Sequence, residues 1–201
     1  RYLLRLLRLS LEMNMEHSNP STPSFYNLSH ETAKIGADNP DNIYLNANIN
    51  GQASNFLTKT PDIFASVRGD LNVEFRLAKI DPQGNLTSGI IRVRSELTNE
   101  PEPRNSVKAL SYWNSYQYFN IWTIKKFLPQ DDGNTLLGYA QFPGGNASSD
   151  GVVCDYAYFG NIGTATSPFH LGRTATHEVG HYLNLRHIWG DSNCGNDYCN
   201  D

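Results

Sequence analysis

Apolar residues recur at every fourth position through one segment near the end of the chain. This stripe consists of Leu171, Ala175, Val179 and Leu183. On a helix such residues lie along one face, and the polar residues between them face the other way. The spacing predicts a helix that begins near Pro168 and packs under a sheet through its apolar face.

Several shorter segments have the alternation, or the aromatic and β-branched composition, that is typical of strands. These segments are residues 72–80, 90–93, 118–124, 136–142 and 151–159. Residues 118–124 are the richest in such side chains and are predicted to be a central strand. D-P-Q-G-N at 81–85 is a turn signal, and P-G-G at 143–145 ends the strand before it.

A second helix is predicted at residues 42–57, although several asparagines weaken its propensity. Strands that alternate with two helices indicate an α/β domain with the helix that begins near Pro168 packed beneath the sheet. Residues 16–41 are rich in Ser, Pro, Asn and Thr and are typical of a linker.

The first 15 residues combine leucine with three arginines but lack a starting methionine and a small-residue cleavage site. They do not have the features of an intact signal peptide. We interpret them as a short amphipathic helix or a non-native leader, with a membrane-surface helix as the alternative. No apolar first strand is predicted within residues 1–40, so residues 1–41 are expected to lie outside the domain formed by residues 42–201.

Length and charge narrow the class of protein. A chain of 201 residues can bury one sizeable core. The net charge of -4 provides no basic surface for nucleic acid. No apolar run approaches the ~20 residues that a membrane span requires.

Three histidines and one glutamate stand close together within residues 177–187. His177 and His181 are one helical turn apart, so both imidazoles project from the same face and can meet one metal ion. Glu178 is rotated by about 100° from them, which places its carboxylate beside the metal. His187 can complete a three-nitrogen zinc site only if the chain turns sharply after His181. The fourth position then stays open for water, as in catalytic zinc sites.

The motif H-E-x-x-H-x-x-G-x-x-H is the zinc signature of the metzincin endopeptidases. The longer run T-A-T-H-E-V-G-H-Y-L-N-L-R-H-I-W-G-D at 174–191 resembles the pappalysin (pregnancy-associated plasma protein-A) family, and its bacterial cytophagalysin-like branch in particular. Further matches are K-T-P-D-I-F at 59–64, V-E-F-R-L-A at 73–78, Y-F-N-I-W at 118–122, L-L-G-Y-A-Q-F-P-G-G at 136–145 and D-G-V-V-C-D-Y-A-Y-F-G at 150–160.

One residue departs from this signature. Asn184 stands where the family has glycine, which ends the helix in a left-handed turn. Asparagine tolerates that conformation best among the other residues, so the turn is still expected.

The resemblance implies a metzincin-type N-terminal catalytic subdomain, with a mixed twisted β-sheet, a backing helix and a zinc-binding active-site helix. Metzincins also carry a methionine-containing turn after the third histidine. Met13 and Met15 both precede the motif, so we expect a catalytic domain whose C-terminal subdomain is truncated. The resemblance further implies a secreted endopeptidase that acts on proteins or peptides, which pair with the edge strand at 136–142.

The loop after the motif carries the remaining candidate ligands. Asp191, Asp197 and Asp201 lie in it, and family members bind calcium near this place. Asp197 and Asp201 are the calcium candidates; a solvated acidic loop is the alternative. The resemblance implies that Cys194 or Cys199 forms a disulfide with a cysteine farther along a longer chain, and a second zinc site on these two thiols is an alternative.

The third cysteine and the three histidines outside the motif are expected to have structural or solvent-facing roles. Cys154 follows two valines and is expected to be a small buried side chain. His17, His30 and His170 have no partner at ligand spacing and are expected to face solvent.

Three functions remain open at the level of the sequence. The leading hypothesis is a zinc endopeptidase in which Glu178 acts as general base toward a zinc-activated water. A catalytically impaired interaction module that keeps the fold and the metal is the second. A sugar-binding β domain would make the spacing of the histidines a coincidence.

Overall fold

The computed structural model describes residues 61–67, 75–99, 101, 103–131, 133–160, 165 and 167–199, and the backbone of 8–12. Its regular elements are four strands, two α-helices and three short 3₁₀ helices. The strands are β1 (Arg8–Glu12), β2 (Tyr118–Ile124), β3 (Gly138–Ala140) and β4 (Val152–Asp155). The helices are α3 (Ser106–Ala109), α4 (Arg173–Tyr182) and the 3₁₀ segments Asp62–Val67, Glu96–Thr98 and Ala147–Ser149.

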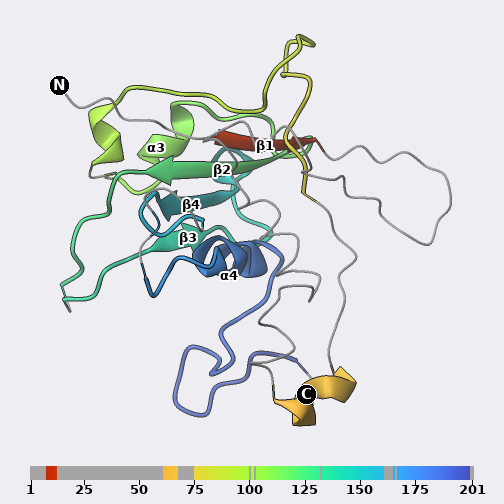
Figure 1. The fold of residues 1–201 in the computed structure, drawn as a ribbon, viewed down its shortest axis with the longest axis vertical. Helices are drawn as coiled ribbons and strands as arrows, with labels where there is room; N and C mark the ends of the chain where they lie inside the picture. Colours follow the sequence, from red (N-terminus) through yellow and green to blue (C-terminus); the bar gives the residue numbers. More distant parts are fainter. Residues whose placement is uncertain are drawn as a thin grey trace, which may run out of the picture.

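The four strands form one mixed sheet in the order β1-β2-β4-β3 (Figure 1). β1 and β2 are antiparallel, β2 and β4 are parallel, and β4 and β3 are antiparallel. Among the described strands β3 is therefore an edge strand, and it lies next to α4 (Figure 1).

The sheet is covered on both faces. β4 shows this because its residues alternate. Val152 and Cys154 pack with Ala175 and Val179 of α4 in one apolar cluster. Val153 points the other way and packs with Val107 of α3 in a second cluster. All seven residues of β2 are buried, as expected for a strand with two covered faces.

The structure confirms several of the predicted elements. β2 has the bounds predicted for the central strand, 118–124. The turn at 81–85 is present, with the Gly84 amide donating to the Asp81 carbonyl at 2.9 Å. Cys154 is fully buried, as expected. The α/β class with a mixed sheet is thus the observed architecture.

Other predictions are wrong in extent or in kind. The strands predicted at 136–142 and 151–159 are shorter, because backbone pairing between β3 and β4 is limited to three residues on each strand. Within 75–80 and 90–93 only Ile80 pairs, in a single bridge to Leu86. Phe75 and Ile90 are nevertheless buried in the core, so their apolar character reflects packing rather than strand pairing.

The N-terminal segment differs most from expectation. Arg8–Glu12 is a strand, although neither a strand nor membership of the sheet was predicted there. Leu9 pairs with Ile121 and Leu11 pairs with Phe119. The alternation R-L-S-L-E carries the period of two that is typical of a strand, and the surrounding leucines obscure it. The helix predicted at 42–57 and the linker at 16–41 lie outside the described residues.

α4 begins at Arg173, five residues later than predicted from Pro168. The segment before it ends at Gly172, which has the left-handed φ of 65° and precedes the first helical residue. No helix among the described residues is long and apolar enough to cross a membrane.

Candidate metal centre

Helix α4 holds the first part of the site. Ala175 and Val179 are buried against the sheet and fix the rotation of the helix. His177 and His181 project from the other side, where His177 is exposed and His181 is half-buried. Their Nε2 atoms are 3.0 Å apart, as the spacing of one turn requires.

A sharp turn at the end of α4 returns the chain toward these histidines. The Leu185 amide donates to the Gly180 carbonyl at 2.8 Å, and the Asn184 amide donates to the His181 carbonyl at 2.9 Å. Asn184 has φ of 75°. These features form a Schellman motif, in which the residue after the C-cap takes the left-handed conformation. The prediction of a left-handed turn at Asn184 is confirmed.

The turn brings His187 to the other two histidines. Its Nε2 atom lies 3.1 Å from Nε2 of His181 and 3.2 Å from Nε2 of His177. Three tetrahedral ligands with Zn–N bonds of 2.0–2.1 Å have nitrogens about 3.3–3.4 Å apart. The three imidazoles therefore fit a single zinc ion. Within the described part of the chain they are the one cluster of His, Cys, Asp and Glu ligand atoms suited to a metal.

The second nitrogen of two of these rings is held by an acceptor. His181 Nδ1 lies 2.8 Å from the Leu185 carbonyl oxygen, and His187 Nδ1 contacts an Asp191 carboxylate oxygen. Because both partners accept, Nδ1 carries the proton and Nε2 keeps its lone pair for a metal. Partial desolvation of the ring and the two neighbouring imidazoles lower the pKa of His177, which favours its neutral form.

Aromatic side chains frame the imidazoles. The Trp189 ring is stacked on His187, with ring centroids 4.4 Å apart and an angle of 5° between the planes. Phe142, which follows β3, lies against His181 with a centroid distance of 5.2 Å. These contacts restrict the orientation of the two rings and cover part of the site with apolar surface.

Glu178 is the one buried carboxylate on α4. Its side chain is 6% exposed, and burial raises its pKa to about 7. No hydrogen bond to this carboxylate is formed by the described residues. Burial of a carboxyl group costs folding free energy when the group is charged, and carboxyl groups with a raised pKa are common at functional sites. Glu178 directly follows His177 in the chain, and its side chain lies against Gly138 of β3.

The structure describes two of the other three acidic candidates. The Asp191 carboxylate accepts a hydrogen bond from His187 Nδ1, which lowers the pKa of Asp191 and holds the imidazole of His187. The sequence signal for that role is its position four residues after His187. Asp197 accepts a hydrogen bond from the Cys199 amide at 3.0 Å. Asp201 lies outside the described residues, and calcium binding by Asp197 and Asp201 stays a prediction.

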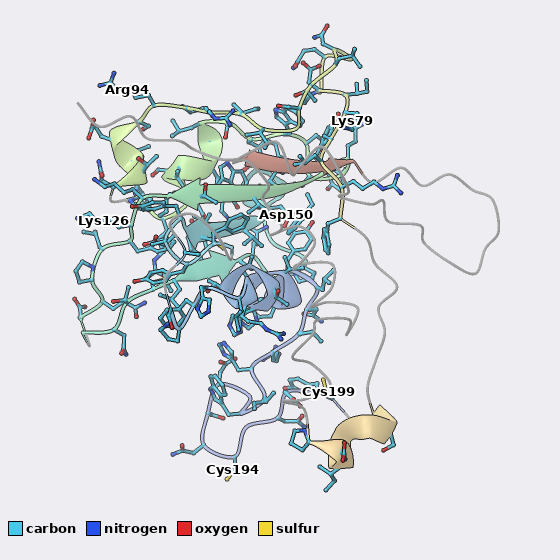
Figure 2. All side chains as sticks on the ribbon, viewed as in Figure 1. Lys79, Arg94, Lys126, Asp150, Cys194 and Cys199 are labelled. Atoms are coloured by element: carbon cyan, nitrogen blue, oxygen red, sulfur yellow. The ribbon has the colours of Figure 1, made fainter. Side chains whose placement is uncertain are left out.

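The cysteines and His170 have other surroundings. Cys194 and Cys199 are exposed free thiols on the loop after α4, away from the sheet (Figure 2). Their pairing with a more distant cysteine stays a prediction. His170 was expected to face solvent, but its Nδ1 atom is buried and has no hydrogen-bond partner.

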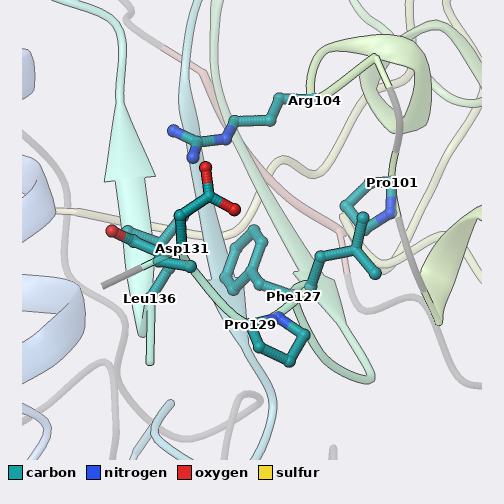
Figure 3. A pocket seen from close by; sticks show the side chains of 8 residues that line it. Pro101, Arg104, Phe127, Pro129, Asp131 and Leu136 are labelled. Carbon is teal, nitrogen blue, oxygen red and sulfur yellow. The ribbon is translucent and has the colours of Figure 1, made fainter. Parts of the chain in front are cut away.

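A cavity of about 460 Å³ opens elsewhere, on the α3 side of the sheet. Arg104 and Asp131 point toward one another above the ring of Phe127 (Figure 3). Leu136, two residues before β3, also lines this cavity. None of the three histidines contributes to its wall, so it is separate from the candidate metal centre.

Comparisons with known proteins agree with this geometry. The family model described as pregnancy-associated plasma protein-A, peptidase M43, matches residues 103–201. Mature mirolysin of Tannerella forsythia, solved in complex with a cleaved peptide, is 38% identical with a TM-score of 0.67. That alignment covers 88% of this chain and 67% of mirolysin. The chain belongs to the pappalysin (M43) family.

Other relatives extend the comparison. Promirolysin of the same organism is 36% identical with a TM-score of 0.70, over 88% of this chain and 59% of promirolysin. An extracellular metalloprotease of Arthroderma otae is 29% identical over 62% of this chain, and one of Colletotrichum graminicola is 43% identical over 43%. The chain spans 42% and 31% of the lengths of these two relatives. The metzincin-type fold predicted from the sequence is confirmed by the match to mirolysin.

Proposed function

We propose that this protein is a secreted zinc-dependent endopeptidase that hydrolyses peptide bonds in proteins. The observation that carries the proposal is the convergence of three Nε2 atoms at 3.0–3.2 Å, two of them on the helix that also carries the buried carboxylate of Glu178. Membership of the pappalysin family and the name of the extracellular relatives support the same activity and the same location.

The ligands in this proposal are the Nε2 atoms of His177, His181 and His187. These three nitrogens would hold a zinc ion, which would supply a lowered pKa for a bound water molecule and polarisation of a peptide carbonyl. Leu185 and Asp191 keep two of the three imidazoles in the correct tautomer, which preserves their basicity toward the metal.

Glu178 is the proposed general base and then the general acid. Its carboxylate accepts a proton from the attacking water and delivers it to the leaving amine. In the metal-free chain burial raises the pKa of this carboxyl group to about 7, which increases its affinity for that proton.

An extended peptide is the proposed substrate. β3 is the edge strand nearest α4, and an edge strand can bind a peptide by main-chain hydrogen bonds. The peptide would then lie between β3 and the histidines, where its carbonyl groups can reach the metal centre.

The test combines metal removal with one isosteric variant in the intact protein. Glu178→Gln should keep one zinc per chain and lose about 10²–10⁴-fold in kcat, because only the proton acceptor is lost. Cleavage of a denatured protein should also stop with a zinc chelator and return with added zinc. Glu96→Gln, an exposed glutamate on a 3₁₀ helix, is the matched control and should keep full activity. Retained turnover in Glu178→Gln would contradict the role of the base, and chelator-resistant cleavage would contradict the role of zinc.

A further inference from the structure

Gly138, the first residue of β3, lies directly against the side chain of Glu178. A Cβ atom placed on Gly138 would be 2.9 Å from Cγ and 3.0 Å from Oε1 of Glu178. It would also be 3.0 Å from the carbonyl oxygen of Val153. Contacts this short between non-bonded heavy atoms are repulsive, so an added methyl group must displace its neighbours.

Both elements of this contact, α4 and β3, are held in place by packing or pairing with the rest of the sheet. α4 is anchored by Val179, which is fully buried, and by Ala175. Gly138 pairs with Cys154 on β4, and the Asp155 amide donates to the Leu137 carbonyl at 2.9 Å. The side chain of Glu178 is therefore the part that must shift when position 138 gains a side chain.

We propose that Gly138 is a positioning residue whose missing side chain leaves the space in which the Glu178 side chain is held against β3, in the orientation that its role as general base requires. This inference rests on the proposed function of Glu178 as general base. The φ of Gly138 is not left-handed, so conformational freedom does not explain a glycine here. The close approach of β3 to α4 explains it instead.

The first test is Gly138→Ala in the intact protein. The variant should lose about 100-fold in kcat, because a displacement of about 1 Å of a reacting group costs this much. KM should change by less than about threefold, and zinc content should stay at one per chain, because the methyl group faces Glu178 rather than the imidazoles. A kcat equal to that of the parent would overturn the proposal. A loss confined to KM would do the same, because it would indicate that position 138 acts on peptide pairing.

Gly145→Ala is the matched control. A Cβ atom there would be 2.6 Å from Nε2, 2.7 Å from Cδ and 2.9 Å from Cγ of Gln141, so its three nearest neighbours all belong to a side chain other than Glu178. Its kcat should stay within about twofold of the parent. A loss in Gly145→Ala as large as that in Gly138→Ala would overturn the specific role of position 138.

A rescue experiment identifies Glu178 as the group through which Gly138 acts. Glu178→Asp shortens the side chain by one methylene and should lower kcat by itself. Adding Gly138→Ala to Glu178→Asp should cause a much smaller further loss than the same change causes in the parent. Equal losses in the two backgrounds would overturn the proposal.

The last readout does not depend on peptidase activity. In metal-free protein, Gly138→Ala should lower the melting temperature, and the decrease should be smaller when Glu178 is replaced by Ala. A decrease of the same size in both backgrounds would assign the clash to the Val153 carbonyl and overturn the proposal. If the parent lacks chelator-sensitive cleavage, the proposed function fails, whereas this comparison still tests the packing of Gly138 against Glu178.

Discussion

At the scale of single residues, Asn184 has the most consequential backbone conformation. Two hydrogen bonds and its φ of 75° close the Schellman turn that leads to His187. A side chain costs free energy in this conformation, and the cost is smallest for asparagine among the non-glycine residues. The substitution of asparagine for the family's glycine is therefore compatible with the three-histidine site.

Replacing Asn184 tests this link between backbone and metal. Asn184→Ala should weaken zinc binding by about tenfold, because the left-handed conformation costs alanine roughly 1–2 kcal/mol. Asn184→Gly, the matched control, should bind zinc at least as tightly as the parent. Competition with a chromophoric chelator measures both affinities. Equal zinc affinity in the alanine variant would mean that the turn is maintained by other contacts.

At the scale of elements, the site depends on how α4 lies against the sheet. Val179 is fully buried and lies between His177 and His181 in the sequence of the helix, and Ala175 lies one turn before it. The predicted stripe is only half buried, because Leu171 and Leu183 at its two ends remain partly exposed. The contact with the sheet is therefore concentrated on the turn that also carries His177, Glu178 and His181.

Val179→Ala tests the energetic weight of this contact. The variant should lose about 2 kcal/mol of unfolding free energy, because it removes two methyl groups from a packed core and leaves a cavity. Leu183→Ala is the control, since Leu183 is 38% exposed and should cost less than about 1 kcal/mol. Denaturant unfolding of the intact protein measures both. Equal losses in the two variants would contradict the anchoring role of Val179.

Element boundaries were less predictable than the elements themselves. The turn at 81–85 and the strand 118–124 depend on local signals, namely Gly and Pro for the turn and a run of β-branched and aromatic residues for the strand. Strand pairing at 90–93 and at 8–12 depends on whether a partner strand lies alongside. A partner strand comes from a distant part of the sequence. Local pattern therefore could not show that residues 90–93 form no strand pairing among the described residues, nor that β1 pairs with β2.

At the scale of the whole molecule, the side chain of Lys108 is buried on the face of the sheet opposite to the candidate metal centre. Lys108 of α3 is 1% exposed, donates to the Ser149 carbonyl at 2.5 Å and lies 5.0 Å from the centre of the Tyr139 ring. Burial lowers its pKa to about 8, and the carboxylate of Asp150 partly opposes this shift. Folding therefore carries a cost for keeping Lys108 charged at neutral pH.

This cost predicts how stability changes with pH. Below pH 8 Lys108 is protonated in both states, and the full cost is present. Between pH 8 and 10.5 the folded protein loses this proton before the unfolded chain does, so the stability contributed by Lys108 rises with pH. The unfolding free energy of the parent relative to Lys108→Met should increase by about 2.5 kcal/mol from pH 7 to pH 10. Denaturant unfolding of both proteins across this range is the measurement, and parallel curves would contradict the lowered pKa.

The sequence by itself determined the chemistry of the candidate site. His177, Glu178 and His181 are related by helical geometry, and helical spacing is a local property that can be derived without a partner element. The turn at Asn184 was derivable for the same reason, because left-handed preference belongs to the residue itself. Together they indicated where His187 would meet the other two imidazoles.

Only the tertiary structure decided the environment of that chemistry. Glu178 is buried because β3 lies over it, and its raised pKa follows from that burial. β3 can approach so closely because position 138 has no side chain, and β1 joins the sheet because β2 offers it a free edge. Each of these contacts joins residues that are far apart along the chain, and their distances are set by the packing of whole elements rather than by any local pattern.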